Sequence, residues 1–443
     1  MRTTLGLMAL LMAALAGCGP DEGGGAGGGG PNGAQSDCFE AKPGCVLPSE
    51  TTRIKDPKVS EEDLASLSQN NASFALDLGR ALHDSTGNVL YSPYSISTAL
   101  AMTYAGARTT TEEAIATTMR FELPQERLHP AFNYVDLELQ SRAQSSSETK
   151  GGGFRLHTAN ALWTQIGMQV EQPFLDVLSA NYGAHVRLAD FGKPKEAEAL
   201  INTWVSNKTE GKIPTLLSDN VTSETLFVLV NAIFFDAAWR TPFEEEATKP
   251  GAFKRGDGTS VTADMMHGVQ ETRYGAGAGW EAVEIPYAGT PVSMFLVMPA
   301  EGTADTFEQS LDGAALEGII AAMMPHSVDV TMPKFSFASS ASLNEALQGL
   351  GMGVAFGDAA DFSGMLKGGG IQIQDVIHKA VIDVNEAGTE AAAATAVIIA
   401  ATGGGGFGEP AAIVLDRPFF FFIRDVPTGA LLFAGRVNDP AAH

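Results

Sequence analysis

Apolar residues recur at helical spacing through much of the first half of the chain. Leu64, Leu67, Phe74, Leu78 and Leu82 fall on one helical face and predict a helix over residues 61–83. A second apolar helix is predicted over residues 96–107, and a polar Thr-Glu-Glu start at residue 111 marks a third. Later helices are predicted over residues 170–182, 195–208, 306–323 and 342–350.

Strand patterns dominate the second half. Segments rich in Val, Ile and Phe predict strands at residues 226–235, 283–285, 292–298, 328–337, 376–384, 413–415 and 419–423. Helices therefore gather early and strands late, which is typical of an α+β fold with large antiparallel or mixed sheets. No linker interrupts residues 57–440, so we expect a single domain there.

One long segment after the strand at 376–384 fits neither pattern. Residues 385–402 are mostly small in their first half and β-branched in their second, and four glycines, 403–406, follow. Connections of this length are usually functional or disordered. Read with a period of two, the segment has one face of Thr, Ala, Val and Ile and a second face that carries its single charge, Glu390. A strand that slides between two others would have this pattern, but an alanine-rich helix or a flexible linker fits the residues too.

Charge and motifs exclude several classes of function. The 443-residue chain has 52 acidic and 28 basic residues, a net charge of −24, and this balance argues against a nucleic-acid partner. HExxH, GxSxG and phosphate-loop motifs do not occur in the sequence, and the one Ser-x-x-Lys, Ser147 to Lys150, lacks the partners of a catalytic site. We therefore expect no enzyme activity, no cofactor and no metal ligands.

The N-terminus is typical of export. Arg2 precedes an apolar stretch from Leu5 to Ala16, and Leu15-Ala16-Gly17-Cys18 resembles a bacterial lipobox, in which the cysteine is lipidated. We expect residues 1–17 to be a signal peptide and 18–56 a glycine-rich tether on a lipidated Cys18; the alternative is a plain secretion signal. Cys38 and Cys45 form either a local disulfide or two free thiols.

The segment after residue 385 resembles the reactive-loop hinge of inhibitory serpins. The resemblance rests on a run of hinge residues, Glu386, Gly388, Thr389, Glu390, Ala391, Ala392, Ala393, Ala394 and Thr395. Further matches to serpin motifs lie at residues 88–96, 202–205, 209–213, 230–235, 332–335, 416–419 and 433–440. The resemblance implies a serpin-like α+β fold with large mixed β-sheets, about eight or nine helices and an exposed reactive loop over about residues 386–412.

It also implies a mechanism and a partner. A target serine protease, or a cysteine protease, attacks the loop and forms an acyl-enzyme, and the cleaved loop then inserts into the main sheet and traps the protease. From Thr389 to Thr402 such a strand spans roughly 46 Å at about 3.3 Å per residue. We expect a monomer at the cell envelope or outside the cell. A non-inhibitory serpin that acts as a substrate or binding protein is the alternative.

The resemblance assigns structural roles to other residues. Ser92, Ser95, Asn231 and His378 match the cluster beneath the part of the sheet that opens, and Trp239 and Lys334 match the top of the sheet, where Lys334 is expected to pair with Glu386. At residues 236–238 the sequence Asp-Ala-Ala stands where the family commonly has Lys-Gly, which leaves the local structure open.

Two positions compete for the scissile bond. The family's spacing from the hinge places it between Thr402 and Gly403, whereas counting back from Asp416 places it between Phe407 and Gly408. We prefer the first bond, because insertion beyond Thr402 buries four glycines, at about 0.5–1 kcal/mol each. Small residues before it favour an elastase-like or subtilisin-like target, whereas Phe407 favours a chymotrypsin-like one.

Overall fold

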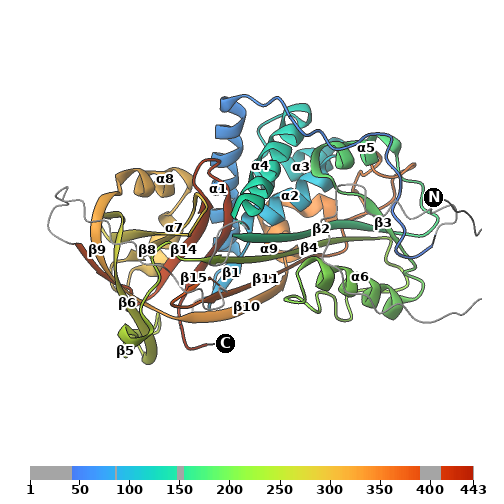
Figure 1. Ribbon diagram of the computed structural model, residues 1–443. Helices are drawn as coiled ribbons and strands as arrows, with labels where there is room; N and C mark the ends of the chain where they lie inside the picture. The colour runs from blue at the N-terminus through green and yellow to red at the C-terminus, as the bar shows by residue number, and fades with distance from the viewer. Residues whose placement is uncertain (1–41, 85–86, 147–153, 390–410, 443) are drawn as a thin grey trace, which may run out of the picture. The chain divides into compact units, whose positions relative to one another are not determined.

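In the computed structural model, residues 42–84, 87–146, 154–389 and 411–442 are described (Figure 1). The expectations for Cys18, Cys38 and the loop residues 390–410 lie outside these ranges, among them Glu390, Ala391 to Ala394, Thr395 and both candidate scissile bonds. The described chain has nine α-helices and two large sheets, and the predicted α+β class is confirmed.

Most of the predicted helices are present. The nine are α1 (Glu61–Ala81), α2 (Pro93–Tyr104), α3 (Thr109–Met119), α4 (Gln125–Ser146), α5 (Gln172–Tyr182), α6 (Pro194–Lys208), α7 (Ala304–Ser310), α8 (Gly313–Ala322) and α9 (Asn344–Leu347). Ser60 caps α1, because its hydroxyl accepts a hydrogen bond from the Asp63 N–H at 3.1 Å. α4 was missed, since its sequence is largely polar and contains Pro130.

Three predicted elements are wrong in their extent. The helix expected over 306–323 is two helices, because Asp312 caps a new one by accepting a hydrogen bond from the Ala315 N–H at 2.8 Å. The helix expected over 342–350 shortens to α9 and a π-turn that contains Gly351 at φ 119°. The strand expected over 328–337 breaks at Lys334, and its two halves belong to different sheets.

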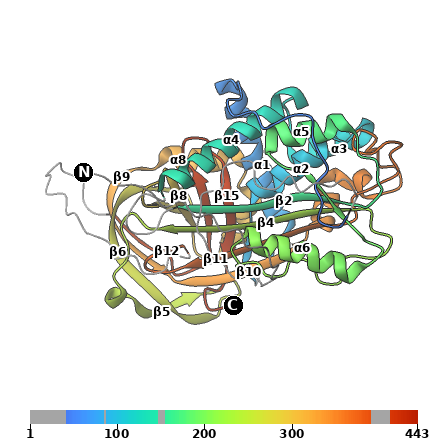
Figure 2. The ribbon, with the colours of Figure 1, turned by 45° about the vertical axis from the view of Figure 1, so that its right-hand side comes forward.

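The six-stranded sheet lies between two helical layers (Figures 1 and 2). Its order is β10 (Phe335–Ser342), β11 (Val376–Val384), β12 (Gly388–Thr389), β4 (Phe227–Ala238), β2 (Arg155–Gln165) and β3 (Val186–Ala189). Helices α2 to α5 lie on one side of it and α6 on the other. β4 is buried along its whole length, which explains its largely apolar sequence; Asn231 and Asp236 are the polar exceptions.

The second sheet has nine strands and curves away from the first. Along it follow β1 (Val89–Tyr91), β15 (Leu431–Val437), β14 (Phe419–Asp425), β8 (Val292–Pro299), β7 (Trp280–Pro286), β6 (Ser260–Gly277), β9 (Met324–Pro333) and β13 (Ala411–Val414), and β5 (Lys249–Lys254) pairs with β6. β13 begins directly after the loop residues 390–410 and is the last strand of this order. One end of the loop is therefore joined to this sheet and the other to the six-stranded sheet.

Residues 44–54 lie against the domain, although we expected a tether up to residue 56. The Gly44 N–H donates to the Leu188 carbonyl at 2.8 Å, and the Leu47 N–H donates to the Val186 carbonyl at 2.9 Å. This segment therefore extends the sheet beyond β3. Cys45, which lies in it, takes part in a disulfide bond.

Candidate functional site

The chain re-enters the six-stranded sheet four residues after β11. Gly388 and Thr389 form β12, which lies between β11 and β4 and runs antiparallel to both. On one side Gly388 pairs with Ala238 and Thr389 with Ala237. On the other side Thr389 pairs with Val384. We expected the exposed loop to begin at Glu386, but the first residues of that segment are packed into the top of the sheet.

Below β12 the two flanking strands close on each other. β11 and β4 pair in parallel from Val376 with Leu229 to Ala380 with Ile233. Above this paired stretch they diverge, and β12 occupies the gap. The sheet is thus open at one end, with the hinge in the opening.

Gly388 is required by close packing at this position. A Cβ atom there would lie 2.2 Å from the Ala237 carbonyl oxygen and 2.7 Å from the Ala238 Cα atom. Only glycine fits such a backbone approach. The Asp-Ala-Ala departure at 236–238 is compatible with this arrangement, since Ala237 and Ala238 are the two residues that pair with β12.

The side chain of Thr389 is buried beneath the sheet. Its hydroxyl lies 2.7 Å from the Tyr287 hydroxyl, and Tyr287 stacks on Trp239 with 4.6 Å between ring centroids. The Trp239 indole N–H donates to the Asn385 carbonyl at 2.9 Å, and its backbone N–H donates to the Ala387 carbonyl at 2.9 Å. Trp239 therefore contacts both the Tyr287 ring beneath the hinge and the backbone carbonyls of the hinge residues Asn385 and Ala387.

Glu386 is the charged anchor of the hinge. The Lys334 ammonium lies 2.9 Å from one carboxylate oxygen, and the Thr248 hydroxyl donates to the other at 2.7 Å. Burial raises the pKa of Glu386, but the hydrogen bonds from Thr248 and Lys334 outweigh burial and bring the pKa below its usual value. The predicted Lys334–Glu386 pair is present.

A polar cluster joins β4 and β11 to helix α2 lower in the sheet. His378 Nδ1 donates to Asn231 Oδ1 at 2.5 Å, and the Ser92 backbone N–H donates to His378 Nε2 at 3.0 Å. The Asn231 amide donates to the Ser95 hydroxyl at 2.7 Å. The four residues predicted for this cluster therefore meet. Asn160 on β2 completes it by accepting a hydrogen bond from the Asn231 amide at 2.9 Å. Sequence reasoning missed this residue, because no local pattern marks it.

His378 is neutral in this site. Complete burial lowers its pKa to about 3, and its Nε2 atom is occupied as an acceptor. An imidazole in this state joins β11 to β4 and to the start of α2 by hydrogen bonds.

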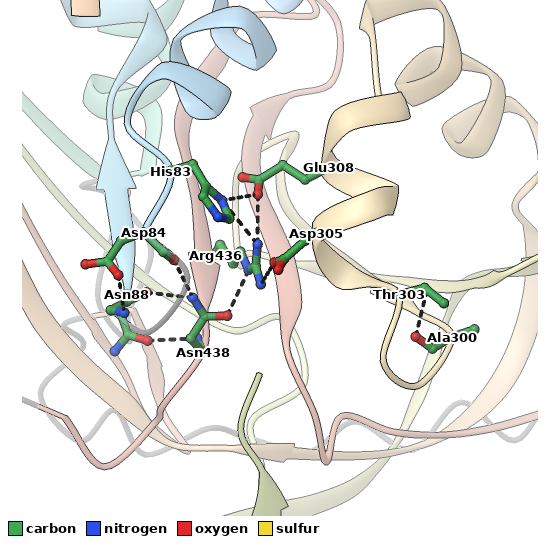
Figure 3. Close-up of polar contacts among 10 residues, drawn as sticks. His83, Asp84, Asn88, Ala300, Thr303, Asp305, Glu308, Arg436 and Asn438 are labelled. Atoms are coloured by element: carbon green, nitrogen blue, oxygen red, sulfur yellow. Dashed lines mark hydrogen bonds and ion pairs between the residues drawn. The ribbon is translucent and has the colours of Figure 1, made fainter. Parts of the chain in front are cut away.

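A second polar cluster lies where α1, α7 and β15 meet (Figure 3). The side chains of His83, Asp305 and Glu308 come close enough together to suggest metal ligands. However, the Arg436 guanidinium lies among them, 2.6 Å from Asp305 and 2.8 Å from Glu308. Because Arg436 is almost fully buried and supplies the cation, this cluster is an ion-pair network of the fold.

The comparisons with known proteins agree with this geometry. The family model described as Serpin (serine protease inhibitor) matches residues 69–440. An uncharacterized serpin-like protein of Thermococcus kodakarensis is 36% identical over 369 residues, which is 83% of this chain and 84% of that protein. The leukocyte elastase inhibitor of Sus scrofa is 35% identical over 392 residues, 84% of this chain and 99% of the inhibitor.

A solved structure is similar along nearly the whole chain. The native state of the thermophilic serpin tengpin superposes with a TM-score of 0.78 at 28% identity and covers 90% of this chain and 100% of that one. The residues matched by the family model, 69–440, contain the strands of both sheets. The chain belongs to the serpin family.

Proposed function

We propose that this protein inhibits serine proteases by inserting its cleaved reactive loop into the six-stranded sheet. The observation that carries the proposal is the position of Gly388 and Thr389, which already pair with β4 and β11 in the antiparallel direction that an inserted strand would follow. A relative named as an elastase inhibitor supports the same function.

The register of β12 can be extended along the loop. Each step forward from Thr389 moves one residue back from Ala237 on β4 and one residue back from Val384 on β11. Thr395 then falls opposite both Asn231 and His378, which are each other's partners in the parallel pairing of the closed sheet. The register of β12 with β4 and its register with β11 therefore predict the same neighbours for an inserted strand.

The same register favours the bond between Thr402 and Gly403. β4 is 12 residues long and begins at Phe227, so it would pair with loop residues 388–399. Cleavage after Thr402 leaves three residues beyond the end of β4, whereas cleavage after Phe407 leaves eight, including four glycines. A longer stretch of chain between the end of the inserted strand and the acyl bond would constrain the trapped protease less.

The chemistry belongs to the protease. Its serine attacks the Thr402 carbonyl, the amine of Gly403 leaves, and an acyl ester joins the two proteins. Small side chains at Ala400, Ala401 and Thr402 suit an elastase-like or subtilisin-like enzyme. Insertion stabilises the cleaved chain before water can hydrolyse the ester.

The test is incubation with a panel of elastase-like, subtilisin-like and chymotrypsin-like proteases. We expect an SDS-resistant complex and a released fragment whose N-terminal sequence begins at Gly403. A fragment that begins at Gly408 would move the scissile bond. Complete turnover of the loop with no covalent complex would favour the alternative function as a substrate or binding protein.

We propose further that Cys18 is lipidated and that the protein is tethered to a membrane of the cell envelope. The lipobox-like sequence and the glycine-rich stretch after it support this location. In the described ranges, α1 to α9 include none with the length and apolar content of a membrane span. A Cys18→Ser variant should lose metabolic labelling by fatty acid and leave the membrane fraction; unchanged membrane association would contradict the proposal.

A further inference from the structure

The N-terminal segment joins the six-stranded sheet at the end that is opposite the hinge. Val46 pairs with Arg187 on β3. Along the same row, Arg187 pairs with Trp163 on β2, and Trp163 pairs with Val228 near the start of β4. The hinge residue Thr389 pairs with β4 nine residues further along, or about 30 Å away at about 3.3 Å per residue.

The direction of the strands fixes where the N-terminal chain leaves the domain. β4 runs toward the hinge, β2 and β3 run away from it, and the segment at Val46 is antiparallel to β3. Residues 44–47 therefore run toward the hinge, and Gly44 lies farthest from it. We call this end of the sheet, with residues 44–47, β3 and the start of β4, the anchor pole. In Figure 1, β3 lies on the opposite side of the view from β6 and β9.

The extended register of the inserted loop ends at the same pole. It places Ile398 beside Val228, and Thr402, which would carry the acyl bond, lies four residues further on. An inserted strand would lie next to β4, and so about 19 Å from the segment at Val46, which is four strand spacings of about 4.8 Å. A protease bound through Thr402 would therefore end beside the point where the N-terminal chain leaves the domain.

We propose that the anchored protein holds its reactive loop away from the lipid surface, and that its tether leaves room for the trapped protease between the anchor pole and the membrane. The inference rests on the proposed function, namely loop insertion and lipidation of Cys18. Before cleavage the hinge end faces outward, so a protease reaches the loop without contacting lipid. After insertion the protease lies at the anchor pole, where a membrane held too close would block it.

The length of the tether fits this role. A globular protease domain of about 230 residues has a radius of gyration of about 17 Å and a diameter of about 45 Å. Cys18 and Cys38 are 20 residues apart, so this stretch alone can span at most about 70 Å. A disulfide between Cys38 and Cys45 would leave this span unchanged. Without residues 21–35, the chain from Cys18 to Gly44 would span at most about 40 Å, which is less than the diameter of the protease.

The experiment uses the mature lipoprotein on vesicles of phosphatidylethanolamine and phosphatidylglycerol, and the same protein after the vesicles are dissolved in detergent. One variant lacks residues 21–35, and the matched control replaces these 15 residues by 15 alternating glycines and serines. Flotation with the vesicles checks the anchor. Gel analysis with the protease panel measures two quantities, the rate of loop cleavage and the fraction of cleaved protein that is held in the covalent complex.

We expect the loop of all three proteins to be cleaved at the same rate on vesicles, because the hinge end faces away from the lipid. On vesicles the covalent fraction of the shortened variant should fall by about fivefold or more, equivalent to about 1 kcal/mol in the barrier to insertion, because hydrolysis of the acyl ester overtakes a blocked insertion. In detergent its covalent fraction should equal that of the wild type and of the glycine–serine control.

A wild-type covalent fraction for the shortened variant on vesicles would overturn the inference and leave the proposed function intact. Slower cleavage of this variant on vesicles, with an unchanged covalent fraction, would mean that the loop faces the membrane and would also overturn it. If no protein formed a covalent complex in detergent, inhibition by insertion would be wrong. If the wild type did not float with the vesicles, the lipid anchor would be wrong. In these last two cases the inference fails together with the proposal on which it rests.

Discussion

His378 links β11 to β4, the two strands that the proposed insertion would separate, and its lowered pKa makes this link sensitive to acid. The folded protein holds the pKa of this imidazole at about 3 through burial, whereas an exposed histidine titrates near 6.5. Between these values the unfolded chain binds a proton that the folded chain does not. The stabilising contribution is therefore complete above pH 6.5 and is lost as the pH falls toward 3.

We predict that His378→Gln flattens the pH dependence of stability. The wild type should lose about 3–5 kcal/mol of unfolding free energy through this residue between pH 6.5 and 3, and the variant should not. Urea-unfolding midpoints of the loop-intact protein, measured from pH 7 to 4, check the difference in slope. The same substitution at the exposed His267 should keep the wild-type slope; equal slopes in all three proteins would disprove the assignment.

At the scale of elements, the hinge is a two-residue strand that depends on its neighbours. β12 alone offers few hydrogen bonds, and its position is fixed by Trp239, Glu386 and the buried Thr389 hydroxyl. In the proposed mechanism the inserted strand extends from β12. A large or charged side chain at its first buried position would therefore oppose growth.

We predict that Thr389→Arg converts the inhibitor into a substrate. Thr389 is 1% exposed and its neighbour Tyr287 is fully buried, so an arginine there would bury a guanidinium without a partner. Gel analysis with a protease that the wild type traps should show cleaved loop and at least tenfold less covalent complex. Ala412→Arg adds the same charge at an exposed position on β13 and should trap normally. Wild-type trapping by Thr389→Arg would rule out insertion through this opening.

At the scale of the whole molecule, the N-terminal segment is joined to the sheet. Beyond the bonds to β3, the Ile54 N–H donates to the Ala180 carbonyl at 2.9 Å, and Arg53 donates to the buried Asn133 at 3.0 Å. Residues 44–54 thus run from the edge of the six-stranded sheet across α5 to α4. A tether attached at this end would pull on the sheet edge that lies away from the hinge strands β11 and β12.

We predict that removal of residues 1–56 lowers the Tm of the loop-intact protein by on the order of 5 °C, because the β3 edge and the surface of α5 lose their cover. Removal of residues 1–37 is the matched control and keeps both Cys38 and Cys45. Differential scanning fluorimetry of the two truncated proteins measures the effect. Equal Tm values would mean that the segment contributes nothing to stability.

Local patterns determined much of this molecule. The apolar spacing of α1, α2 and α5 and the runs rich in Val, Ile and Phe in β4, β11 and β14 are set by residues close in sequence, and these elements form as predicted. The polar cluster and the Lys334–Glu386 pair were also predicted, but only through the resemblance to serpin motifs, and both are present.

Tertiary structure decided what local patterns cannot encode. The break at Lys334, the pairing of residues 44–47 with β3 and the presence of Asn160 in the polar cluster depend on strands that are distant in the chain. The depth to which Thr389 enters the sheet is likewise set by long-range packing. A sequence specifies which side chains can be buried, but the gap between two strands exists only once both have found their places.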